Sequence, residues 1–199
     1  ATMAALVVAA AGTTLTTQLP QLTNNVVHAE DGATQTIPVV TVDVSKEEGD
    51  ADGNYKFEGG MFKLLKREVN YVLTGTTDKK ICFFGTSEQN KTETYYATLD
   101  NLSSTNSITF QNSYAKLVVD VPEGTTNTLK NLNAVDLTIQ GKGTLNAEGI
   151  NITQQGTNTR PSALNITDTT INVKVTGNSN QWHGTCLLSG SANVTFTNA

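Results

Sequence analysis

Short runs of alternating apolar and polar residues fill the chain from Tyr71 onward. Each run is about three to five residues long, and Gly, Asn, Asp and Ser separate it from the next run. An apolar residue at every second position predicts a β-strand with one buried face. The expected strands lie at 71–73, 81–84, 96–99, 107–110, 116–119, 136–139, 143–146, 149–152, 163–166, 171–175, 184–188 and 193–196.

Apolar residues in these runs recur at intervals of roughly 20 to 30 residues, which is the period of solenoid repeats. Val119, Ile139, Ile166 and Val194 mark this period. Strands this short bury little apolar surface in a flat sheet, whereas stacked coils place their inward side chains in one continuous column. Thr suits the outward strand positions, and Gly and Asn suit the corners. We therefore predict an all-β fold, a parallel β-helix.

An antiparallel β-sandwich is the alternative architecture. It would place a hairpin about every eight to twelve residues. The C-terminal half contains no Asn-Gly or Asp-Gly turn between well-matched strands, which favours the β-helix.

The N-terminal segment has the pattern of an export signal. Residues 3–15 are apolar, uncharged and too few to span a bilayer as a helix. Val27 and Ala29 satisfy the small-residue rule for signal-peptidase cleavage. We predict that residues 1–29 are the end of a secretory signal that is cleaved after Ala29; the alternative is a buried N-terminal helix. Since no basic region precedes the apolar run and the sequence stops inside a strand-like pattern, we expect a fragment of a longer exported protein.

The remaining chain divides into two predicted parts. Residues 30–57 are polar and acidic and predict a linker or leader, with room for one strand at 37–44. Residues 58–199 are the predicted β-helix domain, and their first stretch, 58–70, suits one helical turn or a capping segment. We expect no transmembrane span in the mature chain.

Composition and charge remove several classes of protein. The 199 residues carry a formal net charge of -5, and only 16% of them are Asp, Glu, Lys or Arg. The acidic balance argues against nucleic-acid binding, and the low charge content argues against a coiled coil. Recurring Val, Ile and Leu argue against a disordered acidic tail. Thr is about a sixth of the chain and Asn about a tenth, so we expect a polar, uncharged surface.

The two cysteines, Cys82 and Cys186, are far apart and form no metal-binding motif. One disulfide and two free thiols are both compatible with this spacing.

The segment 70–152 resembles a bacterial surface family of carbohydrate-binding domains. The resemblance lies in phrases that follow one another in order. These are YVLTGT at 71–76, a strand beginning at Ile81, ATLDNL at 97–102, DVPEGTTNTL at 120–129, LTIQGKGTLN at 137–146 and a Gly-Ile turn at 149–150. The GTTNTL and GKGTL phrases together are the most specific part, and the match covers under half of the chain.

The resemblance implies an exported right-handed parallel β-helix at the bacterial cell surface. It also implies binding of acidic plant polysaccharide or cellulose, with calcium held on the solenoid. Members of the family often carry an acidic cluster near the Gly-Ile turn, and here that turn has Glu148 as its single carboxylate. The resemblance therefore does not imply a calcium site at this turn.

Oxygen ligands alternate along Asp50, Asp52 and Asn54, with Glu58 beyond them. Calcium takes several hard oxygen ligands on a flexible loop. These four residues are the candidate metal ligands, and calcium is the candidate cofactor. The alternative is a solvated acidic linker.

A polar and aromatic cluster, Asn180, Gln181, Trp182 and His183, is the candidate carbohydrate site. An aromatic ring packs on the C–H groups of a sugar, while amide side chains pair with its hydroxyls. The alternative is that Trp182 folds back onto the solenoid core. Tyr96 is the second aromatic candidate, because in a strand one of two adjacent tyrosines faces inward and the other outward.

Patterns of catalytic residues are not found in the sequence. The carboxylates of Asp120, Asp136, Glu148 and Asp168 are separated, and His183 is the only histidine after the predicted cleavage. We therefore expect no enzymatic activity from these residues.

Together these patterns predict a monomeric, non-catalytic, polysaccharide-binding protein that is secreted or held at the cell surface. The expected ligand is an acidic plant or cell-wall glycan, bound by regularly spaced Thr, Asn and Gln side chains on stacked strands. Two alternatives stay open. One is a structural adhesin or stalk with a protein partner, and the other is a polysaccharide lyase or hydrolase whose active site lies in residues outside this sequence.

Overall fold

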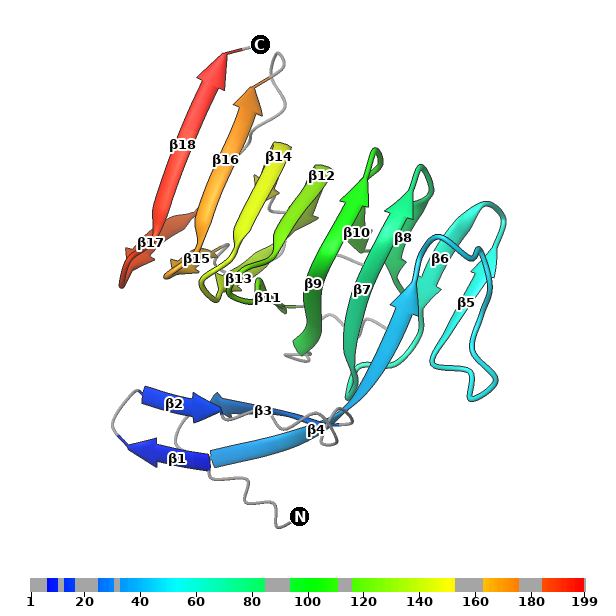
Figure 1. Cartoon of the computed structure of the whole chain (residues 1–199), viewed down its shortest axis with the longest axis horizontal. Helices are drawn as coiled ribbons and strands as arrows, with labels where there is room; N and C mark the ends of the chain where they lie inside the picture. The colour runs from blue at the N-terminus through cyan, green and yellow to red at the C-terminus, as the bar shows by residue number, and fades with distance from the viewer. Residues whose placement is uncertain are drawn as a thin grey trace.

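The chain folds into a parallel β-solenoid in the computed structural model (Figure 1). The structure describes residues 7–10, 13–16, 25–30, 33–84, 94–110, 116–152, 163–175 and 184–198, with side chains from Ile37 onward. The described residues form strands and no helix. Strands far apart in the sequence pair in parallel, so the predicted β-helix is confirmed and the antiparallel sandwich is excluded.

Three parallel sheets form the walls of the solenoid, and each passage of the chain through them is one coil. The first sheet contains β4 (Ala33–Asp43), β7 (Asn70–Thr77), β9 (Thr94–Ser104), β11 (Lys116–Asp120), β13 (Asp136–Gln140), β15 (Ala163–Thr167) and β17 (Thr185–Ser189). The second contains the C-terminal parts of β7 and β9, the N-terminal halves of β12 (Thr126–Ala134) and β14 (Thr144–Ile152), β16 (Thr170–Val175) and β18 (Asn193–Asn198). The third contains β6 (Met61–Leu64), β8 (Lys80–Phe83), β10 (Ile108–Phe110) and the C-terminal halves of β12 and β14.

Antiparallel pairing occurs only near the N-terminus of the described chain. β5 (Tyr55–Glu58) pairs antiparallel with β6, and β3 (Asn25–Glu30) pairs antiparallel with the first half of β4. β1 (Val7–Ala10) and β2 (Thr13–Thr16) form a separate two-stranded sheet. The export signal at 1–29 stays a prediction.

The bend from the first to the second sheet uses left-handed backbone. Gly75 and Gly141 have φ of 93° and 104° at this bend, and Asn101 has φ of 54°. Gly and Asn are the residues that adopt this conformation at least cost. Asn101 is the extra residue of a bulge, because Asp100 pairs with Thr74 while Leu102 pairs with Gly75. The expected preference for Gly and Asn at corners is therefore met at this bend.

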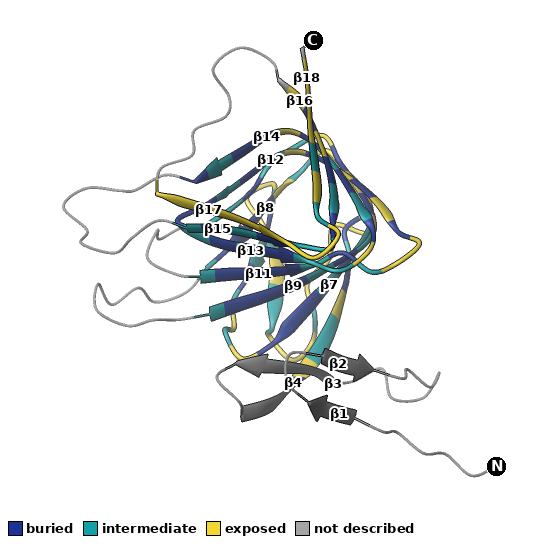
Figure 2. Cartoon of the chain, turned by 90° about the vertical axis from the view of Figure 1, so that its left-hand side faces the viewer, coloured by how far each residue is buried: buried dark blue, intermediate teal, exposed yellow. Residues whose placement is uncertain are grey.

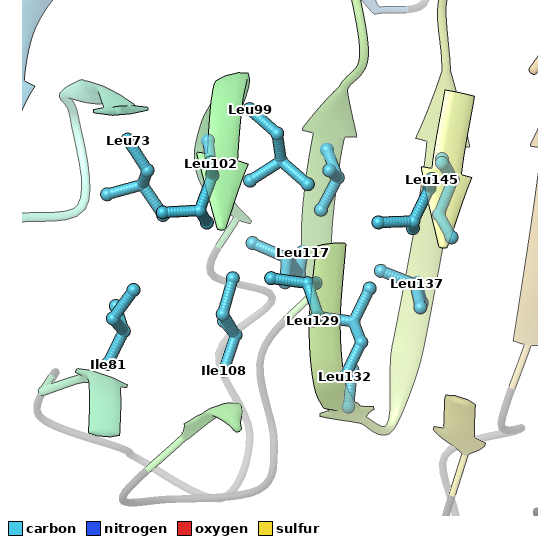
Figure 3. Packing of buried hydrophobic residues seen from close by; sticks show 14 of the residues in the cluster. Leu73, Ile81, Leu99, Leu102, Ile108, Leu117, Leu129, Leu132, Leu137 and Leu145 are labelled. Carbon is cyan, nitrogen blue, oxygen red and sulfur yellow. The ribbon is translucent and has the colours of Figure 1, made fainter. Parts of the chain in front are cut away.

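Aliphatic side chains fill the solenoid interior as a continuous column (Figure 3). Val119, Ile139 and Ile166 stack in register through β11, β13 and β15, and each is at most 1% exposed. Burying one such side chain contributes roughly 1.5–3 kcal/mol. The column is therefore the main stabilising element of a fold whose single strands are too short to be stable alone.

One member of the predicted period belongs elsewhere. Ile166 pairs with Leu188, whereas Val194 pairs with Ile171 in the second sheet. The last coil has two strands with the same alternation, β17 and β18, and sequence periodicity cannot distinguish which sheet each one joins.

The solenoid begins earlier than the predicted boundary at residue 58. Val39 of β4 already pairs with Asn70 of β7, so the strand foreseen at 37–44 is the first strand of the first sheet. The stretch at 58–70 contains a hairpin in place of a helical turn: Gly59 and Gly60, with φ of 62° and 72°, connect β5 to β6. The rings of Phe57 and Phe62 pack across this hairpin, with their centroids 4.9 Å apart and their planes tilted by 53°.

Both cysteines are free thiols, with Cys82 buried and Cys186 exposed. The possible disulfide is therefore not formed. Within the described ranges, no helix of the length and hydropathy needed to cross a membrane is present.

Candidate functional site

The outer face of the second sheet carries a regular array of polar side chains. Alternate residues of a strand point to opposite faces, so Ile171 and Val173 enter the core while Thr170 and Asn172 point outward. The strand register aligns the outward residues in two columns, which we call the polar array. One column is Thr76, Ser103, Thr128, Asn146, Asn172 and Thr195, and the other is Thr126, Thr144, Thr170 and Asn193.

Most of the polar array is open to solvent. Thr76, Ser103, Thr128, Asn172 and Thr195 are exposed, and Asn146 is partly exposed. Neighbouring strands lie about 4.8 Å apart, and outward residues along one strand are about 6.7 Å apart. The two columns therefore present hydroxyl and amide groups on a nearly rectangular grid.

Hydrogen bonds hold the polar array in place. Asn172 Nδ2 donates to Asn146 Oδ1 at 2.9 Å, between side chains of adjacent coils. At the bend, the backbone N–H of Thr126 donates to Asn101 Oδ1 at 3.3 Å. The fully buried Leu145 and Ile171 anchor the same strands from inside. Within the array, one hydrogen bond therefore links two side chains, and the buried residues fix its strands from inside.

Charge lies beside the polar array and not within it. None of its ten side chains is ionisable. The next outward position along the strands carries Lys130, Glu148 and Lys174, all exposed. The array itself therefore offers hydrogen bonds without a net charge, and two ammonium groups with one carboxylate between them stand at its border.

The outer face of the first sheet differs from the polar array. Gln140 Nε2 donates to Asp120 Oδ1 at 2.6 Å, and the hydroxyls of Thr167 and Ser189 are 2.8 Å apart. Asp120, Gln140 and Thr167 are only partly exposed, and Asp120 adds a carboxylate, whereas most of the polar array is exposed and all of it is uncharged.

Tyr96 lies on the outer face of the first sheet, and other side chains cover it there. Tyr95 points into the core, with its ring 5.5 Å from that of Phe83, and Tyr96 points outward, as the alternation predicts. Ile37 and Val118 pack on Tyr96, and its exposed fraction is 5%. The ring predicted to contact sugar is therefore covered by the start of β4, which sequence periodicity could not reveal. The other four candidate residues, 180–183, lie outside the described residues, and their role stays a prediction.

The candidate calcium ligands already have protein partners. Asp50 Oδ1 accepts a 3.0 Å hydrogen bond from the Tyr55 backbone N–H, and Asp50 Oδ2 accepts one from Asn54 Nδ2. Glu58 Oε2 is 2.6 Å from Lys63 Nζ and 3.0 Å from Lys56 Nζ. The hydrogen bond from Lys63, then that from Lys56, lowers the pKa of Glu58 to about 2.

Asp52 is exposed, and its carbonyl oxygen accepts from Lys66 Nζ at 3.2 Å. In the part of the chain that the structure describes, no three His, Cys, Asp or Glu side chains gather as metal ligands. Calcium binding by Asp50, Asp52, Asn54 and Glu58 stays a prediction.

The separated carboxylates have structural contacts. Asp168 Oδ1 accepts hydrogen bonds from the backbone N–H and the hydroxyl of Ser191, at 2.7 and 3.0 Å. These bonds, the backbone one first, lower the pKa of Asp168. Asp168 thus connects the last two described coils. Asp120 likewise connects two coils, because it accepts a hydrogen bond from Gln140.

The sequence predicts outward Thr and Asn side chains on stacked strands, but it does not predict which of these residues align in the polar array. Its signal is a triplet at 126–128, 144–146, 170–172 and 193–195, in which two outward polar residues flank an inward one. The inward residue is apolar in the last three triplets and is the buried Asn127 in the first. In the first three triplets the leading residue is Thr, and in the last it is Asn. The triplet is visible in retrospect, but equivalent triplets of the first sheet mask it.

Neither a family model, nor a curated protein, nor a solved structure matches this chain. The likeness of 70–152 to carbohydrate-binding domains stays a prediction from the sequence.

Proposed function

We propose that this chain is a non-catalytic polysaccharide-binding β-solenoid of an exported, cell-surface protein, and that the polar array is its binding face. The observation that carries the proposal is the in-register alignment of ten uncharged hydroxyl and amide side chains along one open face. A polysaccharide is itself a linear repeat of hydroxyl groups. Two periodic surfaces of this kind bind through many similar contacts.

Affinity in this mechanism comes from the number of contacts. A single hydrogen bond contributes about 0.5–1.5 kcal/mol, because each partner must first leave water. Contacts on adjacent coils belong to one rigid body, so each later contact forms at high effective concentration. Extended polymers are therefore favoured over single sugars.

The proposed ligand is an acidic plant or cell-wall glycan. Lys130 and Lys174 border the array on either side of Glu148, which leaves this row with a net charge of about +1 by simple count. Uronate carboxylates of the polymer can pair with the two ammonium groups. Cellulose is the neutral comparison ligand, since it offers the same hydroxyl repeat without carboxylates. Calcium at residues 50–58 would be a separate requirement, which a chelator tests.

The experiment is retention of the purified chain on polygalacturonate, on xylan and on cellulose, with and without a calcium chelator. The variant Thr128→Val removes one hydroxyl of the array and keeps the β-branched shape. The matched control Thr138→Val makes the same change on the outer face of the first sheet. We expect Thr128→Val to weaken binding of one polymer by about 3- to 10-fold, from the loss of one hydrogen bond, while Thr138→Val leaves it unchanged. Equal effects of the two variants, or no retention on any polymer, would refute the proposal.

A further inference from the structure

A groove of about 240 Å³ adjoins the first coil of the polar array. The second sheet starts at the C-terminal part of β7, because β4 pairs with β7 only as far as Thr74. After β4 the chain turns away, and the backbone N–H of Lys46 donates to the carbonyl of Asp43 at 3.2 Å. The turn at 44–47 lies beside this edge of β7, since a Cβ at Gly75 would be 3.5 Å from Ser45 Cβ. The groove lies where this turn meets 76–78.

Two walls line the groove. Val44, Ser45 and Glu47 form one wall, after β4, and Thr76, Asp78 and Thr105 form the other. The methyl groups of Thr76 and Thr105 are apolar, whereas the hydroxyls and the two carboxylates are hydrogen-bonding groups. Val44 is 1% exposed and packs in the core beneath the groove. A small concave site with an apolar surface and a few polar groups suits a compact ligand that is itself amphipathic. A pyranose ring, with C–H groups on its faces and hydroxyls on its edge, is such a ligand.

The charges at the groove are nearly balanced. Lys79 Nζ is 3.1 Å from Asp78 Oδ1 and 3.5 Å from Glu47 Oε1. One lysine beside two carboxylates leaves a net charge of about -1 at the rim, by simple count of these side chains. Each carboxylate still has lone pairs that accept hydrogen bonds from sugar hydroxyls. A uronate in the groove would be repelled, so the rim selects an uncharged ring.

The groove is continuous with the polar array through Thr76, which is both a wall residue and the first member of the longer column. The column ends at this coil on the N-terminal side, so the groove is the next surface that a polymer lying along the column would reach. We propose that the groove binds the terminal ring of the glycan chain and that this ring is a neutral pyranose at the end of the otherwise acidic polymer. The inference rests on the proposed function of the polar array, and it adds recognition of a chain end.

The test follows backbone amide shifts by NMR during titration of the full chain with cellotetraose, and with tetragalacturonate for comparison. We expect cellotetraose to shift the amides of 44–47 and 76–78, and tetragalacturonate to shift them less. Thr105→Tyr fills the groove, and its backbone N–H bond to the Thr77 carbonyl does not involve the side chain. This variant should weaken cellotetraose binding at least 10-fold. The matched control Thr41→Tyr, at an exposed position of β4, should leave it unchanged.

A second variant guards against misfolding of the first. Glu47→Gln removes one acceptor charge at an exposed side chain and should weaken cellotetraose binding about 3-fold with an unchanged melting temperature. Absence of shifts at 44–47 and 76–78, or equal binding by Thr105→Tyr and the wild-type chain, would overturn the groove. A third outcome would separate the two sites. If Thr128→Val weakens retention on polymers while Thr105→Tyr retains polymers and binds cellotetraose as the wild-type chain does, the array is supported and the groove is overturned. Groove shifts without any polymer retention would refute the proposed function and leave the groove standing.

Discussion

Asn127 Oδ1 accepts a 2.8 Å hydrogen bond from the backbone N–H of Leu102, which lies one coil earlier and 25 residues away in the sequence. Asn127 is completely buried, and its Nδ2 donates to Thr125 Oγ1 at 3.2 Å. The bond fills the gap that the bulge at Asn101 leaves in the second sheet. A buried polar side chain is therefore the connection between two coils below the polar array.

Asn127→Leu should lower the free energy of unfolding by about 1–3 kcal/mol, because the Leu102 N–H would remain buried without a partner. Urea denaturation followed by circular dichroism measures the change. Asn172→Leu is the control, since Asn172 is exposed and its loss should change stability by less than about 0.5 kcal/mol. Equal destabilisation by both substitutions would contradict the buried role of Asn127.

The hydroxyl of Tyr71 ties the turn before β7 to the loop before β5. Tyr71 Oη accepts from the Lys66 backbone N–H at 2.8 Å and donates to the Asn54 carbonyl at 2.8 Å. Tyr71→Phe should destabilise the fold by about 1–3 kcal/mol at neutral pH. Tyr55→Phe is the control, and it should lower the free energy of unfolding by less than Tyr71→Phe does, because Tyr55 is only partly buried. A negligible effect of Tyr71→Phe would show that water replaces the hydroxyl.

Alkaline pH should weaken the fold through the same side chain. Burial raises the pKa of Tyr71 to about 12 from its ordinary value of 10.0. Between these two pKa values the folded state keeps the proton of the Tyr71 hydroxyl, whereas the unfolded state loses it. The contribution of this group to stability is therefore full below pH 10 and is lost as the pH rises through about 12. Between pH 8 and pH 11, the free energy of unfolding should fall less steeply with pH for Tyr71→Phe than for the wild-type chain. Urea denaturation at each pH measures it. Parallel pH profiles would argue against a shifted pKa.

Gly141 allows two stretches of backbone to approach closely at a bend. A Cβ at Gly141 would lie 2.3 Å from the Val121 carbonyl oxygen, and its φ is 104°. Gly124 also has a positive φ, 81°, but a Cβ there would meet nothing within 4 Å. Gly124→Ala should cost about 1–2 kcal/mol for the left-handed conformation alone, and Gly141→Ala about 1–3 kcal/mol more from overpacking. Thermal denaturation of the two variants tests the difference, and similar melting temperatures would rule out the close approach.

The last two described strands, β17 and β18, are largely exposed (Figure 2), and they carry no ionisable residue except Cys186. Leu187, Leu188 and Phe196 are 59%, 50% and 50% exposed, and β17 is the last strand of the first sheet. Edge strands without charges pair readily with other chains. Leu187→Lys should therefore reduce light scattering during refolding, compared with Thr41→Lys, which adds the same charge on β4. Unchanged scattering in Leu187→Lys would indicate that this edge does not associate.

Much of the solenoid was predictable because its signal is local. Alternation at 136–139 and at 163–166 depends only on neighbouring residues, and both segments are strands with inward Leu and Ile. The first strand of the solenoid was harder to assign, since acidic residues follow 39–43 directly and resemble a linker. The hairpin at β5 and β6 was missed because two adjacent glycines gave no sign of which strands they would connect.

The candidate site was less predictable than the fold. Tyr96 faces outward as the two-residue period requires, but only the packing of Ile37 shows that this outward face is covered. Val194 shares its alternation with Leu188, and only the register assigns them to different sheets.

The sequence by itself determined that the chain forms short strands with aliphatic residues on one face, because side-chain direction alternates along any extended backbone. It also indicated that Gly and Asn suit the bends, since both tolerate left-handed backbone, but it did not single out Asp168, which has φ of 60° between β15 and β16. Only the tertiary structure decided which strands are neighbours, because pairing between coils depends on contacts between residues some 20 to 30 positions apart. That pairing places Thr128, Asn146 and Asn172 in one open column and covers Tyr96, and no local pattern carries this information.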